Sequence, residues 1–215
     1  MPAEPGTDLR HFQTRPLLLV VSAPSGGGKT TVCQGLLEKC PSFSRAITCT
    51  TRVPRVGEMD GRDYYFLSAE AFRAKLEAGE FLEHATVHDH LYGTLRQEVL
   101  DHLGRNGDVV LNIDVQGAAS VRGRVAEIPL LAGAIVSVFL MPPSLAELQR
   151  RLQRRAQDPA ETIARRLEAA RRETEHWREF DYVMVSGSVA EDLRRLQVVV
   201  ESERMRAARA VLKPI

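Results

Sequence analysis

Residues 17–30 of the chain read LLLVVSAPSGGGKT, an apolar run that leads straight into a turn rich in glycine. The apolar run at 17–22 is typical of a central parallel strand that is covered on both faces. Residues 30–39 have a helical composition, with Val32, Leu36 and Leu37 at helical spacing. A strand, a glycine turn and a helix in this order predict an α/β fold, in which helices pack on both faces of a parallel sheet.

The turn itself predicts a phosphate-binding loop. Residues 23–30 fit the pattern G-x-x-x-x-G-K-[ST], except that alanine holds the first position. Glycines let backbone N–H groups turn inward around a phosphate, and the following helix presents its positive end. Lys29 would reach the β- and γ-phosphates, and the Thr30 hydroxyl would bind Mg²⁺. A glycine-rich turn without a ligand is disfavoured, because the strand and the helix that the motif requires are both present. The expected ATP site consists of Ala23, Pro24, Ser25, Gly26, Gly27, Gly28, Lys29, Thr30 and Thr31.

Three further apolar runs, at residues 109–113, 134–141 and 182–185, predict strands of the same sheet. Residues 48–94 predict a small α+β insert, with a strand at 64–67, a helix at 68–78 and a strand at 80–87. Residues 145–180 are predicted to be helical with a break at 157–159, and a last helix at 189–212 closes the domain. Residues 1–15 are polar and contain two prolines, which predicts a disordered leader.

Composition restricts the classes of protein that the chain can belong to. The chain has 215 residues, of which 44% are apolar, and this composition predicts one globular domain. Its net charge of +1 gives it no overall electrostatic field that would attract nucleic acid. The three cysteines have no paired-ligand spacing, which indicates a reducing compartment. No apolar run approaches the roughly 20 residues that span a membrane. We therefore expect a cytoplasmic protein that has neither nucleic acid nor a membrane as its partner.

Asp114 follows the predicted strand at 109–113, so its carboxylate is expected beside the phosphate-binding loop, where a metal or its waters would lie. A carboxylate that merely caps a turn is the alternative. The next residue is Val115, whereas a hydrolytic ATPase of the common type needs a water-activating carboxylate there. The guanine-reading N-K-x-D pattern of GTPases is also absent. The sequence thus favours transfer to an acceptor that is already a nucleophile, such as a phosphate, over hydrolysis.

Transfer between two anions requires cations, and the chain carries two groups of arginines. Arg52 and Arg55 flank Pro54 in a loop rich in glycine, which is suited to a forked phosphate receptor, although a solvated basic loop fits the pattern equally well. The second group lies in the helical segment at 145–180, where spacing places Arg151 and Arg155 on one face. Several arginines of this segment are expected to be solvated.

These residues resemble the guanylate kinases, and the resemblance runs from about Pro16 to Leu212. Its most specific stretch is T-T-R-x-P-R-x-G-E-x-x-G-x-x-Y-x-F at 50–66. The segments at 81–83 (FLE), 91–94 (LYGT) and 114–117 (DVQG) follow at the family's intervals. Several matches in register are far more specific than the phosphate-binding loop alone.

The resemblance implies a P-loop NTPase-type parallel sheet as a core (16–47, 95–141 and 180–215), a GMP-binding lobe (48–94) and a helical lid (142–179). It implies phosphoryl transfer from ATP to GMP or dGMP by a Mg²⁺-dependent monomer or homodimer. Glu83 would accept hydrogen bonds from guanine, and Thr30 and Asp114 would hold Mg²⁺ through the nucleotide and water. The GMP site implied by the family consists of Thr48, Arg52, Arg55, Tyr64, Glu83, Tyr92, Thr94, Asn112 and Asp114. The residues implied to act on the phosphates during transfer are Lys29, Arg52, Arg151, Arg155 and Arg166.

Three positions depart from the family pattern: Asn112 replaces an aspartate, Ala156 replaces a lid glycine, and 186–188 (SGS) replaces N-D-D near the adenine site. Two alternative functions stay open. The first is a catalytically silent binding module of the same fold, which the intact phosphate-binding loop disfavours. The second is a kinase for another phosphorylated acceptor, such as a ribose phosphate, which Tyr64, Glu83 and Tyr92 disfavour.

Overall fold

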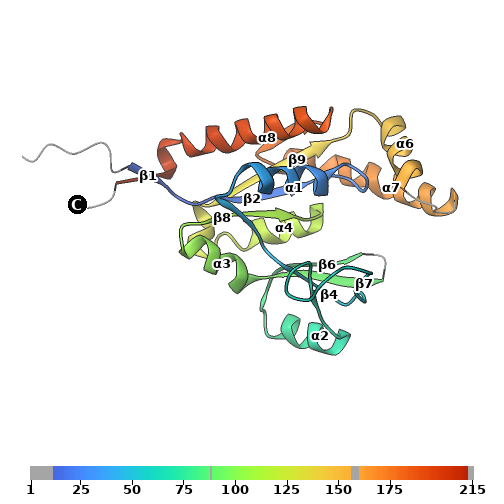
Figure 1. Cartoon of the computed structure of the whole chain (residues 1–215), viewed down its shortest axis with the longest axis horizontal. Coiled ribbons are helices and arrows are strands. Elements are labelled where there is room, and N and C mark those ends of the chain that lie inside the picture. Colours follow the sequence, from blue (N-terminus) through green and yellow to red (C-terminus); the bar gives the residue numbers. More distant parts are fainter. Residues whose placement is uncertain (1–11, 88, 156–159, 213–215) are drawn as a thin grey trace, which may run out of the picture.

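The core of the protein is a sheet of five parallel strands, seen edge-on between two layers of helices (Figure 1). The structure, a computed structural model, describes residues 12–87, 89–155 and 160–212. The strands run in the order β10-β9-β2-β8-β3 and every neighbouring pair is parallel. Their bounds are β2 (Leu18–Ser22), β3 (Phe43–Arg45), β8 (Asp108–Asn112), β9 (Ile135–Met141) and β10 (Tyr182–Val185).

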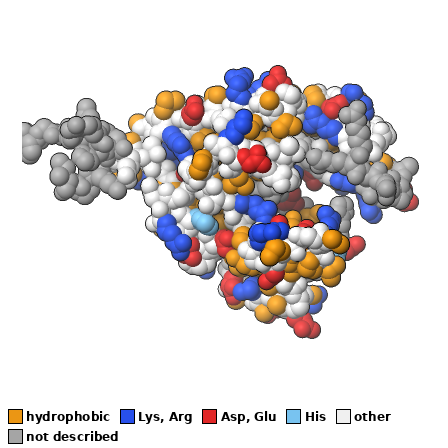
Figure 2. All heavy atoms as spheres, viewed as in Figure 1, with side chains coloured by type: hydrophobic (Ala, Val, Ile, Leu, Met, Phe, Trp, Pro, Cys, Tyr) orange, Lys and Arg blue, Asp and Glu red, His pale blue; other side chains and the backbone are white. Residues whose placement is uncertain are grey.

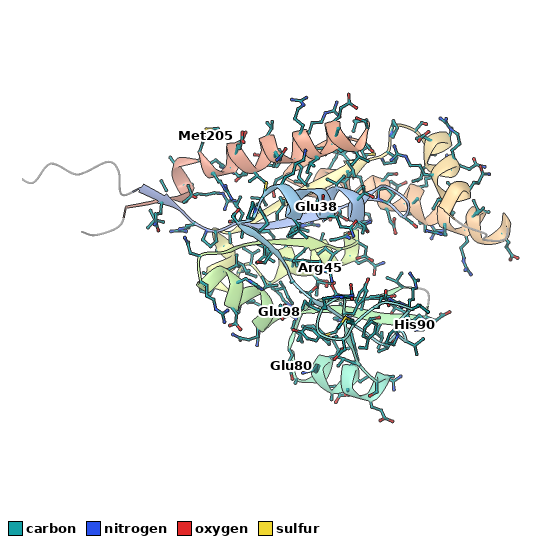
Figure 3. All side chains as sticks on the ribbon, viewed as in Figure 1. Glu38, Arg45, Glu80, His90, Glu98 and Met205 are labelled. Carbon is teal, nitrogen blue, oxygen red and sulfur yellow. The ribbon has the colours of Figure 1, made fainter. Side chains whose placement is uncertain are left out.

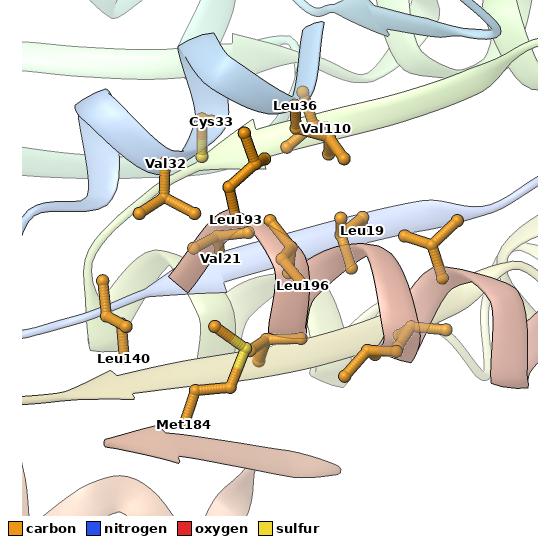
Figure 4. Packing of buried hydrophobic residues seen from close by; sticks show 14 of the residues in the cluster. Leu19, Val21, Val32, Cys33, Leu36, Val110, Leu140, Met184, Leu193 and Leu196 are labelled. Carbon is orange, nitrogen blue, oxygen red and sulfur yellow. The ribbon is translucent and has the colours of Figure 1, made fainter. Parts of the chain in front are cut away.

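Helices cover both faces of this sheet, which explains the uninterrupted apolar run at its centre. Leu19 and Val21 of β2 point toward α1 (Lys29–Lys39) and α8 (Val189–Arg204), where they pack with Val32, Leu36 and Leu196 (Figure 4). Leu18 and Val20 point the other way, into a cluster with α3 (Arg96–Gly104), α4 (Val115–Gly123) and α5 (Pro129–Ala132). The predicted α/β sheet with helices on both faces is confirmed.

The segment that follows β3 forms a second sheet that hangs below the core in Figure 1. It has the order β5-β4-β7-β6, and α2 packs against it through the stacked rings of Phe72 and Phe81, whose centroids lie 4.4 Å apart. The bounds are β4 (Thr48–Thr50), β5 (Tyr65–Phe66), α2 (Ala69–Glu77), β6 (Phe81–Val87) and β7 (His90–Leu95). The strand predicted at 64–67 is shorter than expected, since Tyr64 makes only an isolated bridge to Asp60.

Two polar residues at the junction tie the small sheet to the core (Figure 3). Arg45, at the end of β3, donates to the carbonyl oxygens of Arg62 and Asp63. Glu98 of α3 accepts hydrogen bonds from the backbone N–H of Ile47 and the hydroxyl of Tyr65. The small sheet is thus fixed to the core at the end opposite its β6–β7 turn.

Two antiparallel helices, α6 (Leu145–Arg155) and α7 (Ala160–Glu175), form an arm with its own small core of Leu148, Leu152 and Ala170. A short 3₁₀ turn, η2 (His176–Glu179), connects α7 to β10. The predicted break at 157–159, and Ala156, lie outside the described residues.

The C-terminal prediction needs a correction, because α8 ends at Arg204 and not at 212. Glu203 is buried and accepts hydrogen bonds from Tyr182 and Arg209, and Arg209 also donates to the carbonyl oxygens of residues 133–135. A continued helix could not bring Arg209 back to these partners. The chain instead passes through η3 (Ala207–Arg209) into the strand β11 (Ala210–Leu212).

The leader prediction is wrong for its last residues. β1 (Phe12–Thr14) pairs antiparallel with β11, and the N–H of Arg15 donates to the carbonyl oxygen of Arg209. Residues 1–11 lie outside the described residues. In the described part of the chain, no helix has both the length and the apolar character to cross a bilayer. Basic and acidic side chains are interspersed over the face seen in Figure 2, in keeping with the small net charge.

Candidate active site

The turn between β2 and α1 has the backbone of a phosphate-binding loop. Gly26 and Gly28 have φ values of 84° and 96°, a left-handed conformation that side chains with a Cβ rarely adopt. A Cβ on Gly27 would lie 2.7 Å from the Cβ of Ala23, so glycine is also required for close packing there. The first turn of α1 contains no acidic residue, so its positive end is available to an anion.

Lys29 lies inside this loop, where its Nζ donates to the carbonyl oxygen of Ala23. Burial lowers the pKa of Lys29, while the nearby carboxylates of Glu173 and Asp114 oppose that shift. Ala23, at the first position of the motif, is only 1% exposed, so a small residue is needed there. The loop therefore presents a cation and a helix terminus at the carboxyl end of the parallel sheet, where such folds bind ligands.

A cavity of about 520 Å³ opens between this loop, the small sheet and α7. It brings together nine of the residues that the sequence singled out, from seven separate segments: Ser25, Lys29, Thr48, Tyr64, Glu83, Tyr92, Asn112, Asp114 and Arg166. Gly26, Gly28 and Thr31 instead line a neighbouring cavity of about 340 Å³, together with residues 186–189 and Asp192. One cavity therefore lies on each side of the phosphate-binding loop.

Glu83 is the buried acid of the larger cavity, only 4% exposed. Its Oε1 accepts a 2.6 Å hydrogen bond from the hydroxyl of Thr94, which lies directly opposite it in the β6–β7 ladder. Burial raises the pKa of Glu83 to about 7; the charge of Asp114 adds to the shift, and the Thr94 hydrogen bond opposes it. The second oxygen faces α4 so closely that a Cβ on Gly117 would lie 2.8 Å from it. Because Glu83 also lines the cavity, its carboxylate can accept hydrogen bonds from donors that bind there.

Asp114 and Asn112 stand at the carboxyl end of β8. Asp114 is the N-cap of α4, since its Oδ1 accepts a 2.7 Å hydrogen bond from the N–H of Gly117, so the capping role left open by the sequence is present. The Nδ2 of Asn112 donates to the hydroxyl of Thr30 at 3.1 Å. The described residues contain no group of three or more His, Cys, Asp or Glu side chains that could hold a metal alone. The Thr30 hydroxyl and the Asp114 carboxylate nevertheless fit a Mg²⁺ ion that takes its other ligands from phosphates and water.

Arg52 lies beside the two tyrosines of the small sheet. Its guanidinium carbon is 5.4 Å from the centre of the Tyr64 ring, and the rings of Tyr64 and Tyr92 meet edge to face at 6.2 Å. Its Nη2 forms an ion pair with Glu58 at 2.9 Å, and this hydrogen bond raises the pKa of Arg52. Arg55 is exposed on the loop after β4 and is not among the residues that line the cavity.

The arm contributes to both cavities. Arg166 of α7 donates from Nε and Nη2 to the hydroxyl of Ser25, at 3.3 and 3.2 Å. Arg151 of α6 donates to Glu147 and to the hydroxyl of Ser186, and so lies at the smaller cavity. The side chain of Arg155 lies outside the described residues.

Two residues of the site were missed by the sequence analysis. Glu173 of α7 accepts a 2.9 Å hydrogen bond from the N–H of Ser25, and its pKa is raised by burial. Its spacing of seven residues from Arg166 was a usable signal, because residues two turns apart share a helix face. Asp192, which accepts from the Ser186 hydroxyl and the Gly187 N–H, gave no signal that distinguished it from other acids of the last helix.

Comparison with known proteins agrees with this geometry. The family model described as guanylate kinase matches residues 13–203. The guanylate kinase of Paramagnetospirillum magneticum is 42% identical over 200 residues, which covers 93% of this chain and 91% of that protein. The guanylate kinase of Rhizobium meliloti is 43% identical over 195 residues, covering 91% and 86%. The crystal structure of guanylate kinase from Anaplasma phagocytophilum superposes with a TM-score of 0.74 at 32% identity, covering 94% of this chain and 93% of that one. The chain belongs to the guanylate kinase family.

Proposed function

We propose that this chain transfers the γ-phosphoryl group of ATP to GMP or dGMP, giving ADP and GDP or dGDP. The observation that carries the proposal is the shared cavity, in which Lys29 and the phosphate-binding loop face the buried carboxylate of Glu83. The loop supplies a site for the donor phosphates, and the small sheet supplies a site for a base. A fold that holds two nucleotides in one cavity is suited to transfer between them.

On the donor side, the backbone of the loop, the positive end of α1 and Lys29 bind the β- and γ-phosphates. The base of ATP is assigned to the neighbouring cavity lined by residues 186–189, at the other side of the loop. Mg²⁺ would be held by the Thr30 hydroxyl and, through water, by Asp114, and it would neutralise charge on the triphosphate. Arg166, and Arg151 and Arg155 when the arm closes, add positive charge around the transferred group.

On the acceptor side, Glu83 reads the base. Guanine carries N–H donors at N1 and N2, which a carboxylate can accept together, whereas adenine has an acceptor at N1. Thr48 and Thr94 supply hydroxyls at the same pocket, and Thr94 also orients Glu83. The phosphate of GMP is assigned to Arg52, Arg55, Tyr64 and Tyr92, because guanidinium groups and phenolic hydroxyls donate to phosphate oxygens. Asn112 and Asp114, which line the same cavity as Lys29 and Glu83, are assigned to the space between the two nucleotides.

The transfer itself needs placement and charge neutralisation more than proton transfer. An acceptor phosphate is already a nucleophile, so no general base is required, and exclusion of water favours transfer over hydrolysis. We assign this exclusion to closure of a GMP-binding lobe (48–94) and a lid (142–179) over a core formed by 16–47, 95–141 and 180–215. We further propose that the protein acts in the cytoplasm as a monomer or homodimer, without a nucleic-acid or membrane partner.

A coupled assay of ADP release, with Mg·ATP and each of GMP, dGMP, AMP, CMP and UMP as acceptor, tests the proposal. We expect turnover with GMP and dGMP, and none with GMP when Lys29 is changed to alanine. Tight binding of ATP without turnover on any acceptor would favour a silent binding module. A further arm with ribose 5-phosphate as acceptor tests the other alternative, since turnover on it but not on GMP would favour a kinase for another acceptor.

A further inference from the structure

Glu173 makes a contact between the arm and the phosphate-binding loop that the proposed reaction does not yet use. Its Oε2 accepts the N–H of Ser25 at 2.9 Å. Seven residues earlier on the same helix face, Arg166 donates twice to the hydroxyl of Ser25. One residue of the loop is therefore held through its backbone and its side chain by two residues of α7.

The position of Ser25 in the loop determines what this contact can do. Ser25 precedes the three glycines, and α1 begins only at Lys29. The Glu173 carboxylate therefore contacts the loop four residues before α1 begins and lines the larger cavity beside Lys29, and no described side chain caps the N-terminus of α1. An anion can bind at that helix end while Glu173 stays in place.

The charge of Glu173 also suits a fixed position. It is half-buried and lies near Lys29, whose charge opposes the rise in the pKa of Glu173 that burial causes. A hydrogen bond to a charged group is worth more than one between neutral groups. The two contacts with Ser25 join α7 to the loop at the level of both Glu173 and Arg166.

We propose that Glu173 is a positioning residue, which holds α7 on the phosphate-binding loop and so keeps the guanidinium of Arg166 at the donor phosphates. This inference rests on the proposed function, since Arg166 matters only if a triphosphate reacts there. Glu173 touches neither nucleotide in this role. Its effect passes through Ser25 and the placement of α7.

The test compares Glu173→Ala with Glu173→Gln, and uses Glu168→Gln as a matched control on the same helix. The amide oxygen of glutamine can still accept the Ser25 N–H, whereas alanine cannot. Glu168 is exposed and pairs only weakly with Arg172, at 3.4 Å. We expect kcat to fall about tenfold or more in Glu173→Ala, in line with the loss of a charged hydrogen bond. We expect glutamine to restore most of this loss, KM for GMP to stay unchanged, and the control to behave as the wild type.

Amide hydrogen exchange of residues 160–175, measured on the protein without nucleotide, gives a readout that does not depend on turnover. We expect faster exchange in Glu173→Ala, near-normal exchange in Glu173→Gln and no change in Glu168→Gln. Unchanged kcat and unchanged exchange in Glu173→Ala would overturn the proposal. Tighter ATP binding in both Glu173 variants would also overturn it, because the carboxylate would then be a competitor of the phosphates. If the wild type does not phosphorylate GMP, the proposed function fails, and hydrogen exchange alone decides whether Glu173 holds α7.

Discussion

Gly117 offers a sharp test of the role of Glu83, because it lies behind that carboxylate and not in the nucleotide cavity. A Cβ at this position would lie 2.8 Å from the Oε2 of Glu83, and 3.3 Å from both the Oδ1 of Asp114 and the Cβ of Ile113. Ordinary contacts of a Cβ begin near 3.4 Å. In Gly117→Ala, Glu83 must therefore retreat by several tenths of an ångström, against its 2.6 Å hydrogen bond with Thr94.

The size of the effect follows from how steeply such sites depend on position. A misplacement of about 1 Å can cost about 100-fold in rate. We expect Gly117→Ala to lower kcat/KM for GMP by roughly 10- to 100-fold, which corresponds to about 1.4–2.7 kcal/mol. The loss should appear mainly in KM for GMP, and the preference for GMP over AMP should shrink. Binding of ATP without Mg²⁺ should stay unchanged, because the three atoms nearest to the new Cβ belong to Glu83, Asp114 and Ile113 and not to the phosphate-binding loop.

Gly123 provides the matched control, since it lies in the same helix and a Cβ there would meet nothing within 4 Å. Both substitutions gain up to about 1 kcal/mol of helix propensity, so a comparison of the two isolates the crowding at position 117, where Glu83 is the nearest group. Steady-state kinetics with GMP and with AMP, together with the melting temperature of each variant, make the comparison. If Gly117→Ala and Gly123→Ala had the same KM for GMP and the same GMP preference, Glu83 would not be the group that reads the base.

Four further outcomes follow from the site. Lys29→Ala should abolish turnover yet leave GMP binding by calorimetry intact, because Lys29 serves the donor phosphates. The affinity for GMP should rise as the pH increases through about 7, the value to which burial raises the pKa of Glu83, because the ionised carboxylate accepts both guanine donors. Glu83→Gln should remove this pH dependence and most of the discrimination against AMP. The free energy of unfolding should decrease as the pH rises from 4.5 to about 7, because in this range Glu83 keeps its proton in the folded protein and releases it in the unfolded chain. Asn112→Asp, which adds a carboxylate beside the Thr30 hydroxyl, should lower the Mg²⁺ concentration needed for half-maximal binding of a fluorescent ATP analogue.

Four of the five core strands could be predicted because their apolar runs leave a strong mark on the sequence, whereas β3 was missed, since only the first of its three residues is buried. The strand at 182–185 has the predicted bounds, β2 and β9 begin one residue later than predicted, and β8 is shifted by one residue at both ends. The pairing of β1 with β11 could not be predicted in this way. Both strands have only three residues and lack an alternation of apolar and polar side chains. The segment of β11 is held in place by the hydrogen bond between Arg209 and Glu203, which no local sequence pattern indicates.

The phosphate-binding loop was predictable for a related reason, since its glycines are required by the backbone itself. The cavity was predictable only as a set of residues, and their distances were not. The sequence indicates capping by Asp114 only as an alternative to a place beside the phosphates, and nothing in it indicates that Arg52 is paired with Glu58. These contacts depend on where α4 and the loop after β4 lie relative to their neighbours, which the tertiary fold decides.

Three cations of the site have polar partners within the protein. Lys29 donates to a carbonyl oxygen, Arg52 is paired with Glu58, and Arg166 donates to Ser25. When a phosphate binds, each of these cations exchanges its protein partner for a phosphate oxygen, so the gain in free energy is only the difference between two hydrogen-bonded states. A single phosphate contact gains little under this condition, whereas a nucleotide that meets several cations at once gains the sum of the differences. Selectivity for two phosphorylated substrates, held together, thus follows from the engaged state of the site as much as from its positive charge.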